Sequence, residues 1–189
     1  VGSAGISSAA FIAADGRYAL EKGALVKRDA DGKAELARFA VPELTGTARI
    51  YGILDQNIIY GSNLKLLCSS LADGAVRWTV VASEGRRIGS VALGADKVFY
   101  SQDLPVEKVA RDRRRGESAF PPSQICAVDA RSGRVLWKVS ASTLTALLTC
   151  DTERGMLIQY DSLNRQFCLS ASDGGRLSRS TGPCSRSTR

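Results

Sequence analysis

Short apolar runs alternate with polar turns along the chain, and no helical periodicity connects them. A polar turn often precedes three strand-forming residues, as residues 15–17 precede Tyr18, Ala19 and Leu20. Further along each repeat, two apolar runs flank a turn that contains glycine, as in residues 125–139. Such a turn predicts a β-hairpin, because glycine adopts a positive φ at little steric cost. The pattern therefore predicts short strands joined by tight turns.

This arrangement occurs four times. The turn glycines are separated by 42, 59 and 41 residues, and they are Gly32, Gly74, Gly133 and Gly174. Each repeat offers four short strands, and the repeats cover residues 6–41, 48–82, 88–140 and 143–181. Four-stranded repeats at this period are typical of β-propeller blades. We expect an all-β chain whose residues 1–181 form a β-propeller of about four four-stranded blades, closed or part of a larger propeller. We expect residues 182–189 to be a disordered tail.

The third repeat is about 17 residues longer than the others, and the segment 101–123 accounts for the excess. The segment holds three of the five prolines and a basic cluster: Arg111, Arg113, Arg114 and Arg115. Around the cluster, between residues 107 and 117, Lys108 and the four arginines are offset by Glu107, Asp112 and Glu117, which leaves a charge of +2. We interpret the segment as a solvated, mobile loop at a hairpin tip. Its four arginines are candidate contacts for an anion or a partner.

The third repeat also carries the pattern A-x-D-x-x-[ST]-G-x-x-x-W. Its fixed positions are Ala127, Asp129, Ser132, Gly133 and Trp137. The second repeat keeps the glycine and the tryptophan of this pattern, as Gly74 and Trp78. When the turn glycines are aligned, Leu36 of the first repeat and Ser178 of the fourth stand at the tryptophan position.

This pattern resembles the tryptophan-docking repeat of pyrroloquinoline-quinone-like (quinoprotein-type) β-propellers. In that family, the tryptophan of one blade packs between the small residue of its own motif and the glycine peptide of a neighbouring blade. The resemblance implies a structural docking role for Ala127, Asp129, Gly133, Trp137, Gly74 and Trp78. It also implies that docking is weaker at the two ends of the chain, where Leu36 and Ser178 replace the indole.

The resemblance extends less well to the enzymes of the family. Quinone-dependent dehydrogenases have eight blades, an Asp base, a calcium-type ion held by Glu and Asn, and often a disulfide between adjacent cysteines. This chain has four repeats and no adjacent cysteines. It also has no histidine, which is the commonest general base and metal ligand. We therefore expect no catalytic residue, no cofactor and no metal, and a protein that is not an enzyme.

The five cysteines are odd in number and scattered, without C-x-x-C spacing. Such a set is typical of reduced thiols and predicts an intracellular protein, whose compartment is unknown. We expect Cys68 and Cys168 to pack as small hydrophobic residues at the alanine position of the motif, and Cys184 in the tail to be the reactive thiol. No apolar run approaches the roughly 20 residues of a membrane span, so we expect no membrane partner.

The function predicted from these features is a non-catalytic β-propeller interaction or scaffold module. It would bind a protein partner through its loop tips or channel mouth, or associate with the rest of a larger propeller. The chain does not begin with Met, so we expect a processed chain or an excerpt of a longer one, and we favour an excerpt of a longer propeller. One alternative is a subunit that contacts nucleic acid through its basic loop, although no aromatic residues for base stacking are interleaved with the arginines. The other alternative is a degenerate fragment of a quinoprotein dehydrogenase.

Overall fold

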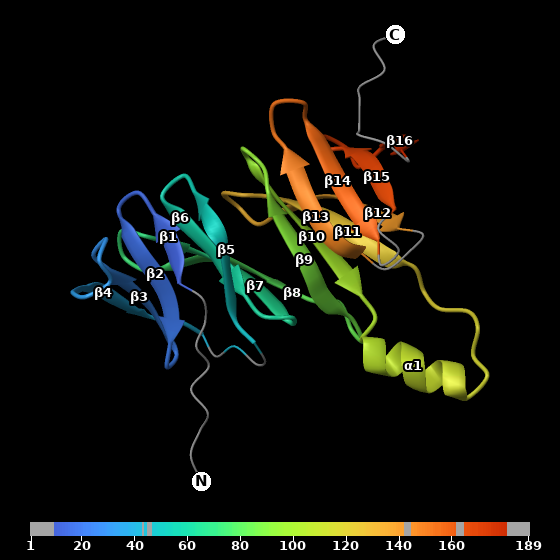
Figure 1. Ribbon diagram of the computed structural model, residues 1–189, viewed down its shortest axis with the longest axis horizontal. Coiled ribbons are helices and arrows are strands. Elements are labelled where there is room, and N and C mark those ends of the chain that lie inside the picture. Colours follow the sequence, from blue (N-terminus) through green and yellow to red (C-terminus); the bar gives the residue numbers. More distant parts are fainter. Residues whose placement is uncertain (1–9, 43, 45–46, 142–144, 162–164, 181–189) are drawn as a thin grey trace. The chain divides into compact units, whose positions relative to one another are not determined.

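The computed structural model describes residues 10–42, 44, 47–141, 145–161 and 165–180 of the chain. They form four antiparallel sheets of four strands each, together with one helix (Figure 1). Within each sheet, strands that follow one another in the sequence lie side by side. We call the sheets blades 1 to 4 in chain order. The predicted tail, residues 182–189, lies outside the described residues.

Blades 1 and 2 belong to one compact unit, Val1–Val81. Blade 1 consists of β1 (Phe11–Ala13), β2 (Gly16–Glu21), β3 (Ala24–Arg28) and β4 (Glu35–Ala40). Blade 2 consists of β5 (Arg49–Leu54), β6 (Asn57–Gly61), β7 (Lys65–Ser70) and β8 (Val76–Val81). The two blades meet where β1 and β2 approach β5.

Blades 3 and 4 belong to a second compact unit, Ala82–Arg189. Blade 3 consists of β9 (Arg87–Leu93), β10 (Lys97–Asp103), β11 (Ser123–Asp129) and β12 (Val135–Ala141). Blade 4 consists of β13 (Thr145–Asp151), β14 (Met156–Asp161), β15 (Gln166–Ser170) and β16 (Arg176–Ser180). The first strands of the two blades, β9 and β13, lie against each other.

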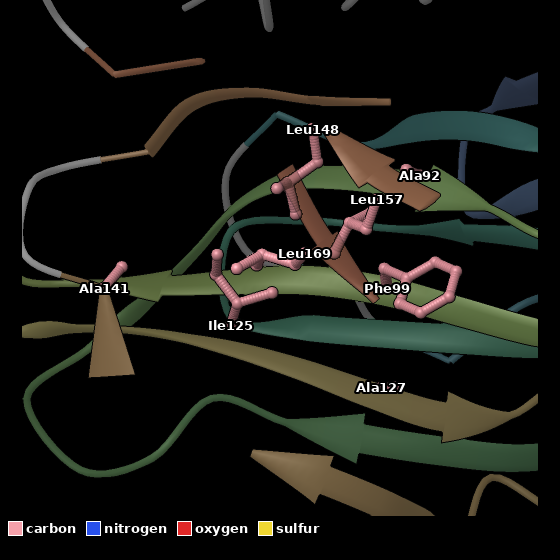
Figure 2. Close-up of a cluster of buried hydrophobic side chains, with 8 residues drawn as sticks. All are labelled: Ala92, Phe99, Ile125, Ala127, Ala141, Leu148, Leu157 and Leu169. Atoms are coloured by element: carbon pink, nitrogen blue, oxygen red, sulfur yellow. The ribbon is translucent and has the colours of Figure 1, made fainter. Parts of the chain in front are cut away.

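Each unit has its core between its two blades. In the second unit, Phe99 and Ile125 of blade 3 pack with Leu148, Leu157 and Leu169 of blade 4 (Figure 2). In the first unit, the core is built from residues of β2, β3, β6 and β7: Tyr18, Leu20, Leu25, Ile58, Tyr60 and Leu67. The last strand of a blade is only half covered, as the alternating exposure along β4 and β12 shows. Strands in the middle of a blade are covered on both faces and therefore read as continuous apolar runs.

The basic insertion contains the helix α1 (Val106–Arg114), so the prediction of a plain loop is wrong there. The helix follows Pro105 and has Glu107 in its first turn and three arginines in its last turn. This distribution of charge complements the helix dipole. An ion pair between Lys108 and Asp112, at 2.7 Å and one turn apart, adds to it. Among the described residues, no helix is long and apolar enough to cross a membrane.

Candidate functional site

The turn between β11 and β12 is held by the aspartate of the docking motif. One carboxylate oxygen of Asp129 accepts hydrogen bonds from the backbone N–H of Ser132 at 2.8 Å and from its hydroxyl at 2.7 Å. These bonds hold the pKa of the Asp129 carboxyl below its usual value. Gly133 has φ +69° and donates its N–H to the Asp129 carbonyl at 2.9 Å. The aspartate, the serine and the glycine of the motif thus form one closed turn.

Trp137 lies eight residues beyond Asp129 and connects blade 3 to blade 4. It stands opposite Ala127, which is fully buried, and its ring lies 5.8 Å from that of Phe99. Its indole N–H donates to the carbonyl oxygen of Ala171 in blade 4 at 3.3 Å. A Cβ atom on Gly174 would lie 2.8 Å from the indole, so only glycine fits beneath the ring.

Blades 1 and 2 meet through a different aromatic residue. The ring of Phe39 in β4 lies directly on Gly74, which has φ +72° and leaves no space for a Cβ atom. Leu36, which the glycine alignment placed at the docking position, is 58% exposed. The expectation that Leu36 takes the place of the indole is therefore wrong.

The error comes from the position of glycine within the first turn. Gly32 bonds to Asp29, three residues earlier, whereas Gly133 bonds to Asp129, four residues earlier. Asp29 and Asp129 otherwise correspond, because each donates its N–H to the carbonyl five residues later. When Asp29 is aligned with Asp129, Ala37 takes the position of Trp137. The strand pairing agrees, because Ala37 lies opposite Lys27 and Trp137 lies opposite Ala127.

The other two repeats keep the expected backbone register. Trp78 stands opposite Cys68 in blade 2 and is 7% exposed, and Ser178 stands opposite Cys168 in blade 4. Cys68 is fully buried, and burial raises the pKa of its thiol to about 11. It packs as a small apolar residue rather than as a reactive thiol.

The cysteines differ in their covalent state. Cys68, Cys126 and Cys150 form no disulfide, whereas Cys168 is disulfide-bonded, so the expectation of reduced thiols is wrong for Cys168. The prediction of an intracellular protein rested on reduced thiols and loses part of its support. Cys184, the predicted reactive thiol, lies outside the described residues.

The four candidate arginines all lie at the C-terminal end of α1 or directly after it. The guanidinium of Arg111 is 3.8 Å from the Asp112 carboxylate, and that of Arg113 lies 5.6 Å from the centre of the Phe120 ring. The side chains of Arg114 and Arg115 are exposed and take part in no ion pair within the described part of the chain. The helix thus brings together cationic groups that the sequence placed in a loop.

Two arginines that sequence reasoning did not single out hold the insertion: Arg86 at its two ends and Arg87 at the start of α1. Arg86 donates from one nitrogen to the carbonyl oxygens of Gln102 and Pro122, both at 3.0 Å, and so joins the two ends of the insertion. Arg87 donates to the carboxylate of Glu107, in the first turn of α1, at 2.9 Å. No motif in the sequence marks either residue, since both contacts join residues far apart in the chain.

Comparison with known proteins adds to this picture. No protein-family model matches the chain, and no curated protein matches it by sequence. Among solved structures, the crystal structure of BamB from Moraxella catarrhalis is similar, with a TM-score of 0.58 and 14% sequence identity. The fold is a β-propeller of the pyrroloquinoline-quinone-like kind. The similarity covers 90% of this chain and 50% of that structure, so the chain spans half its length.

The predicted fold class, an all-β propeller with four four-stranded blades, is thereby confirmed. Between the turns of blades 3 and 4, the propeller has an open cavity of about 230 Å³, smaller than most ligand pockets. Its lining includes Asp96 and Lys97, which pair at 2.9 Å, and Cys150, whose thiol pKa is raised by burial. Within the described residues, no group of three or more His, Cys, Asp or Glu is placed to hold a metal ion.

Proposed function

We propose that this chain is a non-catalytic β-propeller module that binds a protein partner through the α1 insertion. One observation carries the proposal: α1 is an exposed helix outside the four sheets, joined to blade 3 by the bond of Arg87 to Glu107, in an insertion whose two ends Arg86 holds together. Loops on a rigid β scaffold commonly carry binding surfaces. A helix held at both ends of its insertion loses less conformational freedom on binding than a free loop.

The chemistry of the polar side chains supports a role without catalysis. Asp129, Asp151 and Asp161 each accept hydrogen bonds from residues of their own turns. The pKa of Asp129 and that of Asp151 are both lowered by such bonds, so these carboxyls are ionised at neutral pH and are poor general acids. In the cavity between blades 3 and 4, Asp96 forms an ion pair with Lys97, which also lines the cavity.

A photo-crosslinking amino acid at single positions tests the proposal. Val106, at the start of α1, is 68% exposed, and Leu177, on the outer strand β16, is 47% exposed and serves as the control. We expect a discrete protein adduct in cells from position 106 and none from position 177. No adduct at position 106, or the same adducts from both positions, contradicts the proposal. Dye reduction that depends on calcium and a quinone contradicts its non-catalytic part.

We also propose that the four blades associate with the rest of a larger propeller. The similarity to BamB supports this, because four blades align with half of that structure. Light scattering on the 20.1 kDa chain tests it. A dimer, or aggregation that a longer chain abolishes, is the expected result, and a compact monomer contradicts it.

A further inference from the structure

We propose that the exposed face of α1 binds an acidic segment of a protein partner, with Arg114 and Arg115 as the contacts for its carboxylates. This inference rests on the function proposed above and names the chemistry of the partner. The neighbouring apolar contacts are Val106 and Ala110, which are exposed on the same helix.

The ion pairs of α1 distinguish these two arginines from its other cations. Lys108 pairs with Asp112 at 2.7 Å, and Arg111 lies 3.8 Å from the same carboxylate. Arg113 lies over Phe120. Arg114 and Arg115 remain, adjacent to each other and in no ion pair in the described part of the chain, and the charge of Arg115 contributes to the lowered pKa of Asp112. The planar guanidinium group is suited to bind a carboxylate through two parallel hydrogen bonds.

The apolar and basic residues of this surface lie at opposite ends of α1. Val106 and Ala110 are one turn apart and therefore lie on one side of α1, and Arg114 follows after another turn. Val106 is 68% exposed. This side of the helix thus runs from apolar to basic along its length. It fits a segment that presents an apolar side chain at one end and carboxylates at the other.

The surroundings of the arginines favour a protein segment over nucleic acid. Of the basic residues of this insertion, only Arg114 and Arg115 are in no ion pair or ring contact within the described part of the chain, and two adjacent guanidinium groups suit the carboxylates of a short segment better than the many phosphates of a strand. Nucleic-acid sites combine a basic groove with aromatic faces that are open for base stacking. In this insertion, Arg113 already lies over the Phe120 ring.

Fluorescence anisotropy with labelled peptides tests this inference on the 189-residue chain. The probe is a 12-residue peptide of Glu and Leu, and its comparison peptide has Gln in place of every Glu. The variants are R114E/R115E and, because Glu is unfavourable at a helix C-terminus, R114Q/R115Q. The control is R77E/R134E, which makes the same change in net charge as R114E/R115E, at two exposed arginines outside the insertion.

We expect the acidic peptide to bind, the Gln peptide to bind at least about tenfold more weakly, and both Arg114/Arg115 variants to lose about tenfold in affinity. The control should stay within about twofold of the unchanged chain. Equal losses in the control and the Arg114/Arg115 variants overturn the inference, as does tighter binding of single-stranded DNA of the same charge. If the peptide fails to bind while position 106 still gives a protein adduct, the acidic partner is wrong and the proposed interaction module stands.

Discussion

The indole of Trp137 in blade 3 lies on the backbone of Gly174 in blade 4 and donates its N–H to Ala171 at 3.3 Å. Phe39 in blade 1 lies on Gly74 in blade 2 in a comparable way. Both glycines have φ above +70° and belong to the turn that precedes the last strand of their blade. In each unit, an aromatic ring from one blade therefore covers a glycine turn of the next.

Replacing Gly174 by alanine should destabilise the second unit. The new Cβ atom would lie 2.8 Å from Trp137 and from Val139, and alanine is also strained at the φ of +74°. Together, the backbone strain and the overpacking should lower the free energy of unfolding by about 2–4 kcal/mol in urea denaturation.

The control for this variant is G85A. Gly85 has a similar φ of +69° but has no atom within 4 Å of the Cβ position. Only the backbone strain, about 1–2 kcal/mol, applies there. Equal destabilisation by the two substitutions would mean that the indole does not restrict position 174.

A second pair of variants tests which residue of blade 1 docks on blade 2. F39A removes the ring that lies on Gly74 and should lower the free energy of unfolding by about 2–4 kcal/mol. L36A removes a side chain that is 58% exposed and should change it by less than about 0.5 kcal/mol. Urea denaturation of the two variants measures both effects. A larger loss for L36A than for F39A would restore the assignment made from the sequence.

How far the sequence predicts the fold depends on whether the deciding contacts are local. The hairpin turns at Gly74, Gly133 and Gly174 follow from the sequence, because glycine is required at a position set by neighbouring residues. The docking residue of blade 1 does not follow in this way. Its turn has the same length as the others but carries glycine one residue earlier, and the hydrogen bonds of Asp29 correct the alignment. The corrected alignment places Ala37 at the tryptophan position, so the contact of Phe39 with Gly74 is known only from the structure.

The insertion could have been predicted in part. Pro105, Glu107 in the first turn and basic residues in the last turn are recognised signals of a helix, and the prediction of a loop did not use them. The contacts of Arg86 with Gln102 and Pro122 could not be predicted, since they depend on tertiary structure. The disulfide of Cys168 has no signal in the spacing of the cysteines either.

The buried thiol of Cys68 should make stability fall at alkaline pH. Burial raises its pKa to about 11, whereas an unfolded cysteine titrates near about 8.5. Below pH 8 the thiol is neutral in both states. Above that value the unfolded chain ionises first, and this lowers the free energy of unfolding by about 1–2 kcal/mol between pH 8 and pH 10.

Urea denaturation at pH 8 and pH 10 checks this, with C68A as the comparison. The unchanged chain should lose more stability than C68A, and the difference reports Cys68 alone. Both proteins should still lose some stability, because burial also raises the pKa of Cys126 and that of Tyr100. Identical losses in the two proteins would show that Cys68 ionises as readily when folded as when unfolded.

Removing the α1 insertion tests the central claim most directly. Gln102 and Gln124 are paired in register on β10 and β11, so a four-residue turn in place of residues 104–122 closes the hairpin without moving either strand. The decisive measurement is the affinity of this shortened chain for the protein captured at position 106. We predict that the shortened chain keeps the circular dichroism of the four blades and binds that protein at least about tenfold more weakly. Unchanged affinity in a folded, shortened chain would contradict the account.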